Sequence, residues 1–428
     1  MRLEIGNIFV KDIQFSDSTR VEQGVLYVNA SELEQKLSAD DRFHKVKLDI
    51  AKPGEQVRIC PVKDVIEPRV KVSGRGGVFP GFLSGVETVG EGRTNVLKGA
   101  AVVTVGPIVG FQEGIVDMCG PGSDYTPFSK TLNLTVECEP KPGLKQWDHE
   151  EAVRMAGLEA AAYLAEAVKE VQPDEILVYE TLPFSESNDD LVALPRVAYV
   201  YMLQSQGLLH DTYVYGVDAK KILPTLIFPQ EVMDGAIISG NCVSACDKNT
   251  TYHHLNNPII HDLFERHAKD LNFVGVVITN ENVTLKDKER SSSYTAKLVE
   301  MLGVDGVIVS EEGFGNPDTD LIMNCKKISA RGIKTVLVTD EYAGRDGASQ
   351  SLADADASAD AVVTAGNANA VIELPPMEKV IGTLPPVDKI AGGFDGSLGS
   401  DQSIRCEIQA ITGATNELGF NRLSAKGY

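Results

Sequence analysis

The sequence predicts an α/β protein: a β-rich N-terminal region is followed by layers of mostly parallel sheet with flanking helices. Up to about residue 140, short runs alternate apolar and polar residues, as at Leu3, Ile5, Ile8 and Val10, which is typical of strands with one buried face. After Pro142-Gly143, apolar strand-like runs alternate with helical patterns. Such alternation indicates βαβ units and therefore a parallel sheet.

The chain has 428 residues, which is enough for two or three domains. We expect four parts: a β-rich domain over residues 1–140, an α/β region over 141–241, a second α/β region over 242–374, and residues 375–428. The last part contains Pro375-Pro376, Pro385-Pro386 and Gly392-Gly393. This composition predicts an extended tail over the surface.

In the N-terminal part, Ser31 and Glu34 form a capping-box pattern that predicts the start of a short helix. Strands are expected over residues 1–14, 24–29, 45–50, 56–61, 65–72 and 100–105. The glycine-dense tract 74–110 could include a phosphate-binding loop. No helical pattern follows it, however, and tight turns between strands explain it better.

In the second half, Asp148 is expected to cap a helix that runs to about Val171. Further helices are predicted over residues 194–206, 258–270, 292–302 and 318–331. Strands are predicted over residues 175–179, 211–216, 235–239, 273–279, 305–309, 334–339 and 361–364. The strand at 175–179 is expected to be buried.

Composition narrows the class of protein. The net charge of −21 argues against a nucleic-acid partner, because no basic patch is present to neutralise phosphates. No apolar run approaches the ~20 residues needed to span a bilayer, and the N-terminus lacks a signal-peptide pattern. Seven scattered cysteines indicate reduced thiols and a cytoplasmic protein.

Polar residues follow the predicted strands, and the carboxyl ends of parallel strands meet at one edge of a sheet, where ligands bind. The residues expected there are Glu180, Thr181, Asn241, Cys242, Asn280, Glu281, Asn282, Ser310, Glu311, Glu312, Asp340 and Glu341. The alternative is that loops and helix N-termini are commonly polar or acidic for structural reasons.

The stretch from Asp234 to His261 is the most unusual of the chain. An apolar run ends at Gly240, and Asn241-Cys242 follows at once. A zinc site built from Cys242, Cys246, His253, His254 and His261 is conceivable, but the spacing matches no usual ligand pattern. We therefore predict no metal site.

The Asn241–Cys242 peptide bond is a candidate for self-cleavage. A thiol can attack the preceding carbonyl in an N-to-S acyl shift, which requires a tight turn, a base and an oxyanion donor. Gly240 permits the turn, and His253 or His254 could be the base. The product could hydrolyse to an N-terminal cysteine or eliminate to dehydroalanine and then a pyruvoyl group. The residues leave both routes open, as well as a plain buried or catalytic cysteine.

Residues 240–259 (GNCVSACDKNTTYHHLNNPI) resemble the processing site of the proprotein of component B of glycine, sarcosine and betaine reductases, and more distantly the D-proline reductase proprotein. Residues 1–13, 92–104, 110–122 and 311–318 also look like this family. The resemblance covers essentially the whole chain, and the Asn-Cys junction is its most specific part.

The resemblance implies cleavage between Asn241 and Cys242, which gives chains of 241 and 187 residues. Cys242 would become an N-terminal pyruvoyl group that forms a Schiff base with a small amino acid. A selenocysteine of a partner component B subunit would then displace the nitrogen. The other implied partners are the small selenoprotein A, the acetyl-phosphate-forming component C and thioredoxin. Glycine is the favoured substrate, with sarcosine or betaine as alternatives.

Imine chemistry needs an acid for proton transfer in a nearly dry site. Glu311, Glu312, Asp340 or Glu341 could supply it. Lys248 and Arg266 are the nearest cations in sequence that could bind a substrate carboxylate. Two other classes remain open: a self-processing amidohydrolase that keeps Cys242 as a thiol nucleophile, and a non-enzymatic binding subunit in which Cys242 is merely buried.

Overall fold

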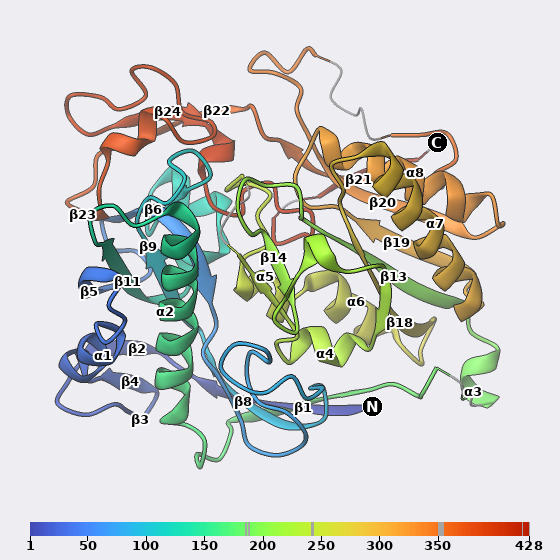
Figure 1. Ribbon diagram of the computed structural model, residues 1–428, viewed down its shortest axis with the longest axis horizontal. Helices are drawn as coiled ribbons and strands as arrows, with labels where there is room; N and C mark the ends of the chain where they lie inside the picture. The colour runs from blue at the N-terminus through green and yellow to red at the C-terminus, as the bar shows by residue number, and fades with distance from the viewer. Residues whose placement is uncertain (185, 187–188, 241–243, 350–354, 422, 428) are drawn as a thin grey trace.

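The structure is a computed structural model that describes residues 1–184, 186, 189–240, 244–349, 355–421 and 423–427. Asn241 and Cys242 lie outside the described residues. Figure 1 shows the N-terminal sheets (blue to teal) on one side of the molecule and the parallel sheet of the second half (green to orange) on the other. The predicted α/β class is confirmed.

The N-terminal part is β-rich, as predicted, and forms three sheets. Their strand orders are β12-β1-β8-β7, β10-β6-β9-β11-β5 with β23 added beside β6, and β2-β4-β3. The strands are β1 (Arg2–Phe9), β2 (Asp12–Phe15), β3 (Arg20–Glu22), β4 (Val25–Val28), β5 (Phe43–Ala51), β6 (Val57–Ile66), β7 (Arg69–Lys71), β8 (Gly92–Lys98), β9 (Ala100–Val105), β10 (Gly114–Asp117), β11 (Leu132–Pro140), β12 (Glu175–Glu180) and β23 (Lys379–Gly382). The short helix α1 (Ala30–Leu37) follows β4.

Helix α2 (Gln146–Glu166) packs against β6, β7, β9 and β11. At Gly157 an added Cβ would lie 2.7 Å from Thr104 Cγ2 and 2.8 Å from Ile66 Cδ1. The helix therefore approaches the sheet more closely than any larger residue at this position would allow.

The second half contains a seven-stranded sheet with the order β16-β18-β13-β19-β20-β21-β25. Its five central strands are mutually parallel. The strands are β13 (Arg196–Leu203), β16 (Thr225–Ile227), β18 (Asn272–Asn280), β19 (Gly306–Ser310), β20 (Lys334–Glu341), β21 (Ala361–Asn367) and β25 (Ser424–Gly427). The mostly parallel sheet is thus confirmed.

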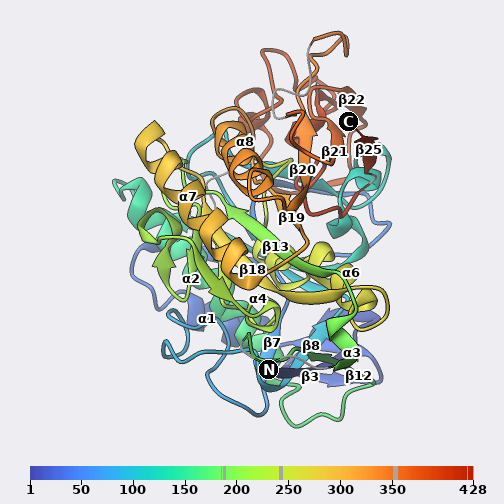
Figure 2. The ribbon, with the colours of Figure 1, turned by 90° about the vertical axis from the view of Figure 1, so that its right-hand side faces the viewer.

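Helices cover both faces of this sheet (Figure 2). On one face, Ala198, Val200 and Met202 of β13 join the apolar core under α7 (Leu285–Leu302) and α8 (Asn316–Ser329). On the other face, Tyr199, Tyr201 and Leu203 join the core under α6 (Pro258–Arg266). Because successive side chains alternate between two buried faces, β13 is apolar from Val197 to Leu203.

A small antiparallel sheet, β15-β14-β17, lies beside the parallel sheet. Its strands are β14 (Thr212–Val214), β15 (Val217–Asp218) and β17 (Ile237–Ser239). The remaining α-helices are α3 (Asp189–Val192), α4 (Pro229–Met233) and α5 (Thr251–Leu255). Strand β17 leads directly into the Asn241–Cys242 junction.

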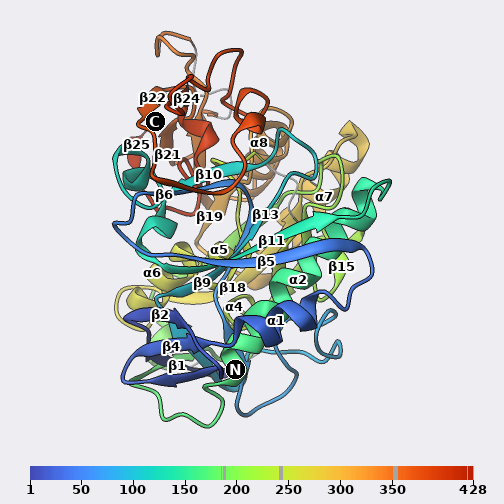
Figure 3. The same ribbon diagram turned by 90° about the vertical axis from the view of Figure 1, so that its left-hand side faces the viewer.

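The C-terminal segment, from residue 375 onward, forms β23, β24 (Ile404–Glu407) and β25, and β24 pairs with β22 (Val371–Leu374). Figure 3 shows this segment gathered above β6 and β10. The sequence predicts an extended surface tail here. Instead β23 pairs with β6, and the residues from Ile408 to Leu418 are buried. The four-part division of the chain stays a prediction.

Several local predictions are wrong. Residues 194–206 hold strand β13 and not a helix, because a strand buried on both faces loses the alternation that identifies strands. Residues 175–179 form an exposed edge strand paired with β1, outside the parallel sheet. Residues 235–239 contain β17, which belongs to the antiparallel sheet.

Helix and strand boundaries also differ. Helix α1 is capped by Asn29, which accepts from Glu32 N, and not by Ser31. Helix α2 begins before Asp148 and ends at Glu166. The runs 56–61 and part of 65–72 form the single strand β6. Among the described residues, no helix is both long and apolar enough to cross a bilayer.

A buried ion pair between β6 and β10 also holds the C-terminal segment through a hydrogen bond from Arg58, and we predict that the fold depends on it. Arg58 donates to Asp117 at 2.6 and 2.8 Å and to Pro375 O at 3.0 Å, and both charged side chains are fully buried. Arg58→Ala leaves the buried Asp117 carboxylate without its cation. We therefore expect the free energy of unfolding, measured with denaturant, to fall by about 3–5 kcal/mol. The matched Arg75→Ala, which breaks the largely exposed pair with Glu91, should cost below about 1 kcal/mol. Equal losses would contradict this role.

Candidate active site at the carboxyl edge of the parallel sheet

The parallel strands deliver four acidic residues to one edge of the sheet, as the sequence predicts. Glu281 follows β18, Glu311 and Glu312 follow β19, and Asp340 lies at the end of β20. All four side chains are at most 3% exposed. Carboxylates rarely occupy such positions without partners, so their surroundings decide what this edge can do.

Glu281 and Glu312 are joined by a hydrogen bond. Glu312 N donates to Glu281 Oε1 at 2.9 Å. The Glu312 carboxyl accepts from Asn249 N at 2.9 Å and Gln204 N at 3.3 Å. Burial raises the pKa of Glu312 to about 8. Burial and the neighbouring charge of Glu312 raise the pKa of Glu281 well above its usual value, so this pair can hold a proton near neutrality.

The loop 244–249 crosses this edge and carries the buried Lys248. The positive charge of Lys248 opposes the effect of burial on the pKa values of Asp64, Asp211 and Glu312. Burial still raises the pKa of Asp211 to about 7. A cation is therefore surrounded by carboxyl groups from three distant parts of the chain.

Both flanks of the Asn241–Cys242 junction are fixed by hydrogen bonds. On one side, Gly240 N donates to Asp211 O at 2.6 Å, and a Cβ at Gly240 would lie 2.4 Å from His210 O. On the other side, Ala245 O accepts from Gly413 N at 2.7 Å. The N-terminal part contributes Asp64, whose Oδ2 accepts a hydrogen bond from Thr251 Oγ1 at 2.7 Å. The same Thr251 hydroxyl accepts from Ser239 N at 3.1 Å.

His253 and His254, the predicted processing bases, lie fully buried on α5. Burial lowers the pKa of each to about 3, so both imidazoles are neutral. His253 Nδ1 lies 3.1 Å from Lys248 O, and His254 Nδ1 lies 2.7 Å from Tyr201 OH. Their role in processing stays a prediction.

Other sequence candidates lie elsewhere. Arg266 is exposed and paired with Asp270, so Lys248 is the one of the two predicted cations that lies at the site. Glu341 accepts from Thr364 Oγ1 on β21. Glu180 is on the exposed edge strand β12. His261 contacts Tyr179, away from Cys246.

Cys246 belongs to a separate group of buried polar side chains beside Lys248. Asp247 Oδ1 accepts from Cys246 Sγ at 2.7 Å and from Thr415 Oγ1 at 2.8 Å. Thr415 Oγ1 also lies 3.3 Å from Asp340 Oδ2. Asn416 Nδ2 donates to Asp247 O, Lys248 O and Asn249 Oδ1. Thr415 and Asn416 of the C-terminal segment therefore pack against the loop 244–249 and form one wall of the site.

Four of these residues were not predicted from the sequence: Asp64, Asp211, Thr415 and Asn416. They lie far from residue 242 in the chain, and no motif surrounds them. Asp211 begins the predicted strand 211–216, whereas ligand residues were expected where strands end. The others reach the site only through tertiary packing.

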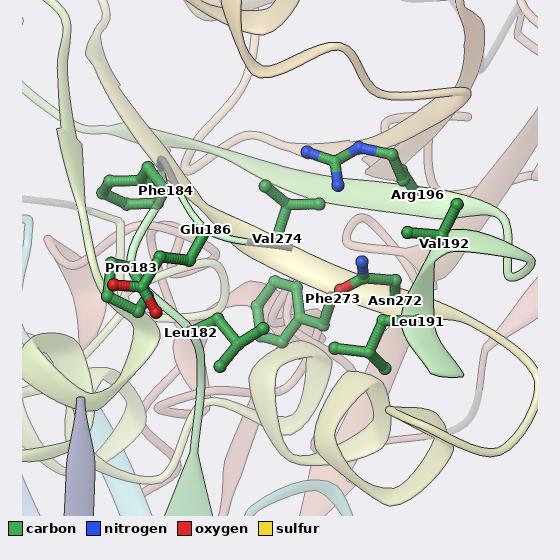
Figure 4. A pocket seen from close by; sticks show the side chains of 10 residues that line it. All are labelled: Leu182, Pro183, Phe184, Glu186, Leu191, Val192, Arg196, Asn272, Phe273 and Val274. Carbon is green, nitrogen blue, oxygen red and sulfur yellow. The ribbon is translucent and has the colours of Figure 1, made fainter. Parts of the chain in front are cut away.

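The pocket in Figure 4 lies at the other end of the sheet. It is lined by Leu182, Pro183, Phe184, Glu186, Leu191, Val192, Arg196, Asn272, Phe273 and Val274. Arg196 and Asn272 begin strands β13 and β18, whereas the acidic edge lies where these strands end, roughly 25 Å away. This pocket is therefore not part of the acidic site.

Fold and site together define an α/β protein with a water-poor centre suited to acid–base chemistry beside Gly240, the residue that precedes Asn241-Cys242 in the chain. The chain belongs to the family of glycine/sarcosine/betaine reductase component B subunits, which matches residues 1–426. No solved structure matches the chain.

Full-length relatives agree with this membership. The chain is 70% identical to "Glycine reductase complex component B subunits alpha and beta" of Acetoanaerobium sticklandii, with complete coverage of both chains. It is 69% identical to the protein with the same name from Peptoclostridium acidaminophilum and 57% identical to "Sarcosine reductase complex component B subunit alpha" of that organism, again with full coverage.

The raised pKa of Glu312 predicts a pH dependence of stability. Between its ordinary value of 4.5 and about 8, the folded protein holds a proton that the unfolded chain releases. Stability therefore falls as pH rises through this window. We expect the wild type to lose about 2–3 kcal/mol more than Glu312→Gln between pH 5.5 and 7.5, measured by urea unfolding. The exposed Glu289→Gln should retain the wild-type slope. Parallel slopes for wild type and Glu312→Gln would contradict the assignment.

Proposed function

We propose that this chain is the precursor of the two substrate-activating subunits of a glycine reductase component B. One observation carries the proposal: the chain is 70% identical over its full length to a protein whose name assigns one chain to two subunits, alpha and beta. A single chain can supply two subunits only if it is cut. The proposed cut is between Asn241 and Cys242.

The cut is proposed to begin with attack of Cys242 Sγ on the Asn241 carbonyl, which gives a thioester and a free Cys242 amine. Loss of the Cys242 α-proton and of the thiocarboxylate would leave dehydroalanine. Water would then convert the enamine to a ketone with release of ammonia, and hydrolyse the thiocarboxylate to carboxylate and hydrogen sulfide. Gly240 and Ala245 are each held by a backbone hydrogen bond, and fixed ends lower the entropic cost of bringing a thiol and a carbonyl together, which favours the first step.

The described residues around the junction fit a pyruvoyl group. Its ketone would supply an electron sink by forming a Schiff base with the substrate amine. Such chemistry needs proton donors at neutral pH and little water. Asp211 and Glu312, whose pKa values are raised to about 7 and 8, are the proposed proton carriers. Glu311, which is buried and accepts a hydrogen bond from Thr339 Oγ1 at 2.7 Å, is a further candidate.

Lys248 is the proposed anchor for the substrate carboxylate. It is 2% exposed, and its charge reaches Asp211 and Glu312. A buried cation binds a carboxylate more strongly than an exposed one, because water competes less. The same placement would keep the amine near the proposed proton carriers.

The proposed overall reaction converts glycine, phosphate and reduced thioredoxin into acetyl phosphate, ammonia, oxidised thioredoxin and water. The chain contains no selenocysteine. The nucleophile that displaces nitrogen would therefore come from the selenocysteine-containing component B subunit. Selenoprotein A would carry the carboxymethyl group, and component C would release acetyl phosphate. Glycine is preferred over sarcosine because the glycine-type relatives are 69–70% identical and the sarcosine-type relative 57%.

Replacement of Cys242 tests the processing step. Cys242→Ala removes the attacking atom, so we expect a single uncut chain on denaturing electrophoresis where the wild type gives two. Cys246→Ala, which changes the other cysteine of the loop, should still be cut. Normal cleavage of Cys242→Ala would show that another group attacks the bond.

The wild-type C-terminal fragment separates the two possible products of cleavage. Its intact mass should fit an N-terminal pyruvoyl group, and it should react with hydrazine and resist Edman degradation. A free N-terminal cysteine would instead support the self-processing amidohydrolase and contradict the pyruvoyl proposal.

Replacement of Lys248 tests substrate binding. Lys248→Met keeps the length of the side chain but removes its charge, and we expect KM for glycine to rise about 10–100-fold, the range for a charge-assisted hydrogen bond. The assay uses the complete reductase with processed component B. Arg266→Met is the matched control and should leave KM unchanged. An unchanged KM in Lys248→Met, with normal cleavage, would exclude Lys248 as the anchor.

A further inference from the structure

The group around Cys246 differs from the rest of the acidic edge because its members converge on one point. One ligand atom each from Cys246, Asp247 and Asp340 lies within 4.8 Å of the others, and all three residues are buried. An ion bonded at about 2.0–2.3 Å holds its ligand atoms within roughly 4.6 Å of one another. Small side-chain adjustments would therefore bring all three atoms onto a common ion.

A fourth residue points to the same ligand. Glu417 is fully buried, and neither of its carboxyl oxygens has a hydrogen-bond partner among the described residues. It lies two residues after Thr415, whose hydroxyl contacts Asp247 and Asp340. Asp247 and Asp340 are among the charges that raise the pKa of Glu417, besides burial, and the Thr415 contacts bring this part of the chain to the two aspartates.

Neither protonation state gives the buried Glu417 carboxyl group a hydrogen-bond partner among the described residues. An ionised carboxylate without a donor loses its hydration, and a neutral acid needs an acceptor for its O–H; the described surroundings provide neither. A divalent cation offsets the repulsion between the carboxylates and gives both oxygens of Glu417 a bonding partner. The hydroxyls of Tyr342 and Thr415, which contact Asp247 at 3.3 and 2.8 Å, are placed to orient the Asp247 carboxylate as outer-shell partners.

We propose that Cys246, Asp247, Asp340 and Glu417 bind a zinc ion. A thiolate favours zinc over magnesium or calcium, and zinc also accepts carboxylate oxygens. The site is separate from the proposed pyruvoyl chemistry and differs from the sequence-based expectation of no metal. The ligands come from the loop after the junction, from the end of β20 and from the C-terminal segment. The ion would therefore fasten the C-terminal segment to the sheet edge.

Metal content tests the site without any measurement of reductase activity. Full-length protein, dialysed against metal-free buffer, should retain close to one zinc per chain by inductively coupled plasma mass spectrometry. Glu417→Gln and Cys246→Ser should each lower zinc affinity at least tenfold. The exposed Glu373→Gln and the partly exposed Cys119→Ser are matched controls and should keep the zinc. Absence of zinc, or equal affinity in all four variants, would overturn the proposal.

X-ray absorption at the zinc edge gives a second readout on the wild type, which stands even if a variant fails to fold. We expect one sulfur at about 2.3 Å and oxygen ligands at about 2.0–2.2 Å. A shell without sulfur, or with several sulfurs, would overturn the assignment. Failure of cleavage at Asn241–Cys242 would contradict the proposed function but leave the zinc result intact.

Discussion

The burial of carboxyl groups at the carboxyl edge of the parallel sheet is the constraint on which the rest of the site depends. Glu281, Glu312 and Asp340 reach this edge because parallel strands end together. Water is excluded there by the loop 244–249 and by residues 412–418. The low polarity raises the pKa values of Glu281 and Glu312, and that shift makes proton transfer at neutral pH possible.

Neighbouring contacts offset the free-energy cost of burying these carboxyl groups. Backbone N–H groups of Asn249 and Gln204 stabilise Glu312, and the Lys248 charge offsets part of the burial cost at Asp211 and Asp64. The N-terminal part of the chain takes part directly, because Asp64 on β6 accepts a hydrogen bond from Thr251, whose hydroxyl accepts one from Ser239 N before the junction. A cut at the proposed bond would therefore leave two chains joined by an extensive buried interface.

Sequence patterns predicted the α/β class, the parallel strands β18, β19, β20 and β21, and the convergence of Glu281, Glu311, Glu312 and Asp340. They failed for β13, whose two buried faces remove the period-2 signal, and for β12, which has strand propensity but joins the N-terminal sheet. Both errors have one cause. The local sequence pattern indicates strand propensity and burial, whereas the strand with which a segment pairs depends on the whole fold.

The sequence by itself determined the Asn241-Cys242 junction, the glycine before it and the resemblance to the component B family, because these are properties of contiguous residues. Only the tertiary structure decided that Lys248 and not Arg266 lies among the acids, and that Thr415 and Glu417 return to residue 247. Contacts between residues so far apart depend on how sheets and loops pack. Local periodicity does not contain that information, because the burial and the electrostatic environment of a site depend on residues that are far apart in the sequence.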